Sequence, residues 1–82
     1  MHKQADNRYK TSVEQIADNL FEANIAYRYS NGNGVYCSVW TRRFTSRTVA
    51  EFELAEAVKT QIPICDRYEA ELVQARKENA KQ

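Results

Sequence analysis

The first apolar pattern along the chain has the spacing of one face of a helix. Between residues 12 and 24 the apolar side chains recur three and four positions apart, at Val13, Ile16, Ala17, Leu20 and Phe21. Ser12 with Gln15 three positions later has the spacing of a capping box, in which each side chain bonds the backbone at the helix start. We therefore predict a helix from about residue 12 to residue 24.

The period changes at "IAYRYS", where aromatic and β-branched residues replace helix formers. The following "NGNG", Asn31 to Gly34, offers two glycines that tolerate positive φ. We predict a two-stranded antiparallel hairpin with its second strand from Val35 to about Arg43. A tight turn centred on Asn33-Gly34 and a longer loop over Asn31 to Gly34 are both compatible with the sequence, and they give different registers.

The second strand of this hairpin carries apolar side chains on both of its faces. One face has Val35, Cys37 and Val39, and the other has Tyr36, Ser38 and Trp40. Only one face can point at the helices. We expect the β-branched and small set to contact the helices and the aromatic set to be exposed or covered by a partner. The alternative is that Trp40 and at least one tyrosine close the core of a small domain.

Helical spacing returns after the hairpin in "TSRTVAEFELAEAVKTQI". Thr45 and Ser46 are candidate caps, and Pro63 predicts a stop near Gln61. The apolar residues of this segment cover more than half of a helical wheel, which suggests two neighbours.

A third helix is predicted from Asp66, which stands with Glu69 at capping-box spacing. It carries a narrow apolar stripe of Tyr68, Leu72 and Ala75.

These elements predict one small α+β domain over residues 11–80, made of a helix, a two-stranded antiparallel β-hairpin and two helices packed on one face of the small sheet. Residues 1–10 are polar and aperiodic, so we expect a flexible N-terminal tail. A lone two-stranded sheet leaves two edges and one face uncovered. A homodimer or a partner protein would cover them.

Composition narrows the functional classes. The chain has 82 residues, a formal net charge of +1 and two cysteines. It contains no apolar run of the roughly 20 residues that span a bilayer, and its N-terminus lacks the apolar centre of a signal peptide. We therefore expect a cytoplasmic protein with reduced thiols and no membrane contact.

Groups for catalysis are scarce. His2 is the single histidine and falls in the predicted tail. Glu51 and Glu53 would point about 200° apart on a helix, so they do not form a facing carboxylate pair. Because "NGNG" joins two strands, it is not a phosphate-binding loop. We predict no enzyme, no cofactor and no metal site.

One segment, Ile25 to Thr48, combines cations with aromatic residues and has no acidic residue. Tyrosine, tryptophan and arginine are enriched at interaction hot spots because they bury a large area and keep a polar group for orientation. The predicted partner-binding residues are Tyr27, Arg28, Tyr29, Tyr36, Trp40, Arg42, Arg43 and Arg47.

Two functional hypotheses follow from this segment. The first is a small non-enzymatic protein-binding module that acts as a scaffold or inhibitor. It docks the basic aromatic hairpin on an acidic partner or on a second copy. Small proteins of phages and mobile elements often have this character. The second is nucleic-acid binding, with the arginines on phosphates and the aromatic rings on bases. The acidic helix start at Glu51 to Glu56 disfavours the second.

Overall fold

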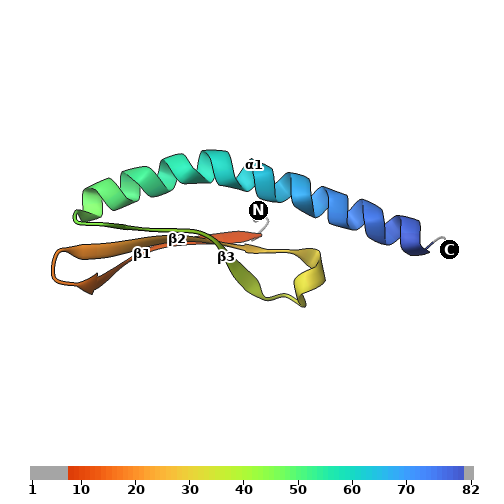
Figure 1. The fold of residues 1–82 in the computed structure, drawn as a ribbon, viewed down its shortest axis with the longest axis horizontal. Helices are drawn as coiled ribbons and strands as arrows, with labels where there is room; N and C mark the ends of the chain where they lie inside the picture. Colours follow the sequence, from red (N-terminus) through yellow and green to blue (C-terminus); the bar gives the residue numbers. More distant parts are fainter. Residues whose placement is uncertain (1–7, 81–82) are drawn as a thin grey trace, which may run out of the picture.

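A computed structural model describes residues 8–80 of the chain. Three antiparallel strands are followed by one long helix that covers a single face of the sheet (Figure 1). The strands follow one another across the sheet in chain order, with the second in the centre. The elements are β1 (Tyr9–Ala17), β2 (Leu20–Arg28), the 3-10 turn η1 (Ser30–Gly32), β3 (Tyr36–Phe44) and α1 (Arg47–Ala80).

The helix predicted for residues 12 to 24 is wrong, because this segment forms most of a β-hairpin. Ala17 pairs with Leu20, so Asp18 and Asn19 make the turn between β1 and β2. Asn19 has φ of 53°, a left-handed conformation that asparagine tolerates better than most residues.

The buried face of β2 explains why helical spacing failed as a guide. Ala23, Ile25 and Tyr27 alternate along this strand, and none of them has exposed surface. That period of two continues across the boundary predicted at residue 24, and a strand satisfies it whereas a helix does not. Ser12 and Gln15 lie within β1, so they form no capping box.

The prediction of two C-terminal helices is also wrong, because α1 runs unbroken through Pro63. Ser46 does cap the helix start, as predicted, since its hydroxyl accepts a hydrogen bond from the backbone N–H of Val49. Pro63 leaves the backbone carbonyl of Lys59 without its usual helical donor, and both residues are exposed. Ala57 and Cys65 are buried on either side of Pro63, and their burial holds the helix on the sheet in both halves.

The β-hairpin predicted around "NGNG" is present, with the longer of the two connections. The pair closest to the loop is Arg28 with Tyr36. The loop contains η1, followed by Asn33 and Gly34 at φ of 57° and 81°.

A β-bulge in β3 changes the expected division of its two faces at Trp40. Ile25 pairs with Trp40 and the next residue, Ala26, pairs with Ser38, which leaves Val39 as the extra residue. Trp40 therefore shares the helix-facing side with the buried β2 residues, and both Val39 and Trp40 pack against the core.

Close packing between α1 and the centre of the sheet forms the core. Ala23 and Ile25 of β2 contact Leu54 and Ala57 of α1. The two alanines add little bulk, so the helix approaches the strands closely. Val13, Trp40 and Phe44 are among the half-buried side chains that close the sides of this cluster.

The N-terminal tail predicted over residues 1–10 falls partly outside the described residues. Residues 1–7, including His2, lie outside them, whereas Tyr9 and Lys10 begin β1.

We expect Ile25→Ala to lower the free energy of unfolding by about 2–5 kcal/mol, since the substitution removes a fully buried side chain and leaves a cavity. Ile16→Ala is the matched control, because Ile16 lies in β1 with 41% of its surface exposed. Urea unfolding followed by circular dichroism measures both. Equal losses in the two variants would contradict the core described here.

Candidate interaction surface

Within residues 8–80, the sheet face that points away from α1 has no helix over it (Figure 1). We call it the open sheet face. Its side chains follow from the strand register, and all but Ala26 are polar, charged or aromatic. They are Lys10, Ser12, Glu14, Glu22, Asn24, Ala26, Arg28, Tyr36, Ser38, Thr41 and Arg43.

Tyr36 is the one aromatic residue of this face, and two cations lie over its ring. The Lys10 Nζ atom is 4.3 Å from the ring centroid, and the Arg28 guanidinium carbon is 5.5 Å from it. We call these three residues the Tyr36 site. Lys10 comes from β1, Arg28 from β2 and Tyr36 from β3, so the site spans the full width of the sheet. A cation over an aromatic face is attracted by its quadrupole and is thereby held in place.

A hydrogen-bonded cluster of small polar side chains lies in the middle of the open sheet face. The Asn24 carbonyl oxygen accepts hydrogen bonds from the Ser38 hydroxyl at 2.5 Å and from the Thr41 hydroxyl at 2.7 Å. These bonds fix an amide and two hydroxyl groups on an exposed surface.

The far end of the open sheet face is electrostatically mixed. Arg43 donates to the Glu22 carboxylate at 3.2 Å. Glu14 is paired directly opposite Glu22 across β1 and β2, so two acidic residues stand side by side there. The positive charge of the face is therefore concentrated at the Tyr36 site.

The eight predicted partner-binding residues do not form one surface. Arg28, Tyr36 and Arg43 lie on the open sheet face. Trp40 and Arg42 lie on the side that faces α1, where the Arg42 guanidinium carbon is 5.9 Å from the Trp40 ring.

The remaining three occupy separate places. Tyr27 has no exposed surface. Tyr29 packs edge-on against Tyr68 of α1 with ring centroids 5.3 Å apart. Arg47 lies over the Phe21 ring at 5.2 Å, near the start of α1.

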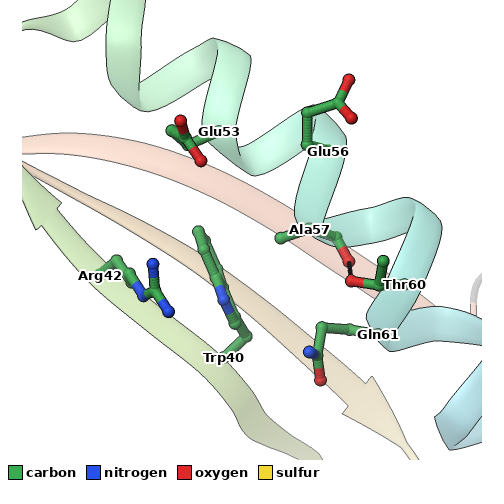
Figure 2. Close-up of a pocket in the computed structure, with 7 residues that line it drawn as sticks. All are labelled: Trp40, Arg42, Glu53, Glu56, Ala57, Thr60 and Gln61. Carbon is green, nitrogen blue, oxygen red and sulfur yellow. Dashed lines mark hydrogen bonds between the residues drawn. The ribbon is translucent and has the colours of Figure 1, made fainter.

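A groove runs between β3 and α1, with a volume of about 290 Å³ (Figure 2). The Trp40 ring stands in its centre, with Arg42 on one side and Gln61 on the other. Glu53, Glu56, Ala57 and Thr60 of α1 form the opposite wall. Thr60 donates its hydroxyl to the Ala57 carbonyl oxygen.

Lys10 is the residue of the Tyr36 site that is not among the eight predicted partner-binding residues. The sequence predicts a flexible tail at this position, whereas the structure places Lys10 in β1. The alternation of Lys10, Ser12 and Glu14 with Thr11 and Val13 carries the signal of a strand with one polar face.

Contacts between the hairpin loop and α1 hold the Tyr36 site in position. The buried Glu69 carboxylate accepts a hydrogen bond from the Ser30 backbone N–H at 3.0 Å. It also forms an ion pair with the Arg8 guanidinium at 3.4 Å. Arg76 donates to the Ser30 hydroxyl at 2.7 Å. The Ser30 N–H lowers the pKa of Glu69 below its ordinary value of 4.5, although burial opposes this shift.

Two tyrosines, the buried Tyr27 and the half-buried Tyr29, lie behind these loop contacts. Burial raises the pKa of the Tyr27 phenol, and the hydrogen bond that its hydroxyl donates to Asp66 adds to the shift. Burial is also the main reason that the pKa of Tyr29 is raised, and a hydrogen bond with Cys65 contributes. Both phenols therefore stay neutral and anchor the hairpin as hydrogen-bonding groups.

Within residues 8–80, histidine, cysteine, aspartate and glutamate side chains form no group of three or more that could hold a metal ion. In the same part of the chain, α1 is too polar to cross a membrane.

We expect Glu69→Gln to lower the free energy of unfolding by about 1–2 kcal/mol at pH 7, because a charge-assisted acceptor for Ser30 and Arg8 is replaced by a neutral one. The folded-state pKa lies below the unfolded one, so the carboxylate stabilises the protein above about pH 4.5, and this contribution is lost as the pH falls.

Urea unfolding at pH 7 and at pH 3 tests this expectation. The difference between wild type and Glu69→Gln should shrink at the lower pH, whereas the exposed control Glu71→Gln should show little difference at either pH. A loss of the same size at both pH values would show that the charge of Glu69 has no role.

Comparisons with known proteins identify no relative of this chain. No protein-family model matches the chain, and neither a curated protein nor a solved structure matches it. The functional argument therefore depends on the side chains of the open sheet face and of the groove.

Proposed function

We propose that this chain is a small non-enzymatic interaction module that docks its open sheet face on an acidic surface of a partner protein. The module acts by covering that surface, as a scaffold or as an inhibitor. The Tyr36 site is the centre of the contact.

The arrangement of Lys10 and Arg28 over the Tyr36 ring is the observation that supports this proposal. The ring restrains both cations, so less side-chain entropy is lost when they meet a carboxylate. Tyrosine and arginine are also residue types that dominate binding energy at protein interfaces. Arg43 is already paired with Glu22, so it contributes less.

A second candidate, nucleic-acid binding, is favoured by the Asn24, Ser38 and Thr41 cluster. Amide and hydroxyl groups on an exposed sheet can bond base edges in a groove. We rank it second because Glu14 and Glu22 lie on the same face and would repel phosphates.

We expect binding to take place in the cytoplasm. The thiols of Cys37 and Cys65 are both free, and a reducing compartment keeps them so.

Capture from an extract of the source cells, followed by calorimetry with the captured protein, tests the primary proposal. We expect Lys10→Ala with Arg28→Ala to weaken binding by about ten- to a hundredfold, because two restrained cations are lost from the contact. The matched control is Lys59→Ala with Lys77→Ala, which removes the same charge from exposed positions of α1. Equal affinity of the two variants would refute docking at the Tyr36 site.

Fluorescence anisotropy with duplex and single-stranded oligonucleotides, at two salt concentrations, separates the second candidate. Binding that weakens steeply with salt and is lost with Lys10 and Arg28 would replace the acidic protein by a nucleic acid as the partner.

A further inference from the structure

The outer edge of β3 is open within the described part of the chain. The sheet order is β1-β2-β3, so the backbone groups of β3 that point away from β2 meet no other strand among residues 8–80. An unpaired edge strand is a template for pairing with another chain.

Exposed apolar side chains occur beside the start of β3 and on the C-terminal half of α1. Val35 before β3 is 59% exposed, and Ile64 and Tyr68 on α1 are 55% and 51% exposed. Tyr68 contacts Tyr29. Ile64 lies one helical turn from Tyr68 and one turn from Thr60, which lines the groove that contains Trp40. The edge of β3 is thus flanked by a surface that gains from being covered.

Two opposite charges on α1 have no partner among residues 8–80. Glu53 and Arg67 form no hydrogen bond or ion pair within that part of the chain. They lie seven positions before and seven positions after Thr60. A separation of fourteen positions is close to four helical turns, so both side chains leave the helix on the side that Thr60 occupies.

Thr60 and Trp40 line the same groove, so the midpoint of this charge pattern lies beside the middle of β3 (Figure 2). A two-fold axis at the β3 edge near Trp40 would therefore also pass near Thr60. Such an axis relates β3 to an antiparallel copy of itself, and it relates α1 to an antiparallel copy of α1.

We propose that two copies of this chain form a two-fold symmetric dimer through the β3 edge. The two sheets join into one sheet of six strands. Glu53 of each copy then faces Arg67 of the other, because residues equally far on either side of Thr60 are brought together. Both ion pairs form at once, as isologous contacts require.

The spacing of the elements fits contacts by long side chains. Since α1 lies over the buried residues of β2, three strand spacings separate the two helices, or about 14 Å. Glutamate and arginine can bridge this separation, and the two Trp40 rings occupy the space between the helices. Arg42 lies two positions from the axis, so the two copies of Arg42 are about 14 Å apart and repel each other weakly.

This dimer is independent of the proposed docking function. It leaves the open sheet face uncovered and places two Tyr36 sites on one continuous sheet.

Charge reversal with rescue tests the dimer. Sedimentation equilibrium should show a wild-type dimer, a dissociation constant raised about tenfold or more in Glu53→Arg and in Arg67→Glu, and recovery in the double variant. Glu78→Arg is the matched control. In the dimer, residue 78 of one copy would face residue 42 of the other, which precedes α1, so this charge reversal should leave the dimer unchanged. Circular dichroism checks that each variant is folded.

A monomeric wild type at millimolar concentration would overturn the proposal. So would a dimer whose dissociation constant changes in neither single variant, or single variants whose weakened dimer the double variant does not restore. Hydrogen exchange at low and high protein concentration locates the interface independently of any substitution. Slower exchange in β3 at high concentration supports the proposal, whereas slower exchange confined to β1 refutes it.

Discussion

Burial of one face of β2 beneath α1 is the constraint on which the other features depend. Ala23, Ile25 and Tyr27 have no exposed surface, and each is separated from the next by a residue that belongs to the opposite face. Because the helix covers only that side, the alternate residues of the strands, which point to the opposite face, contact water or a partner. The open sheet face is thus a direct result of how the core is packed.

A small core also explains why so many charged groups take part in holding the fold. The cluster around Ile25 and Leu54 lies under the N-terminal half of α1, whereas the C-terminal half reaches beyond it to the hairpin loop. There the polar contacts from Glu69 and Arg76 to Ser30 stand beside the apolar contacts of Tyr68 with Tyr29 and of the buried Cys65. The position of the Tyr36 site therefore depends on hydrogen bonds as well as on apolar packing, and it is sensitive to substitutions far away in the sequence.

The sequence was sufficient for the α+β class, for the hairpin around "NGNG" and for the Ser46 cap, because glycine, asparagine and serine act locally. It failed where two local patterns competed. The spacing of Val13, Ile16 and Leu20 suits a helix, but burial of one face of β2 stabilises strands in this segment instead. Pro63 predicts a helix end, yet α1 continues through it because residues on both sides of it are buried against the sheet. The basic aromatic segment was recognised as unusual, but its division between two faces depends on strand pairing, which no local signal reveals.

The bulge at Val39 has a consequence for how the two aromatic residues of β3 are used. In the sequence, Tyr36 and Trp40 are four positions apart, which in a regular strand would place them on the same face. Measured along the sheet, they are three steps apart, because Val39 has no pairing position of its own. An odd number of steps gives one ring to the core and the other to solvent. Deleting Val39 would keep this division, whereas straightening the strand at its present length would reverse the side on which Tyr36 lies.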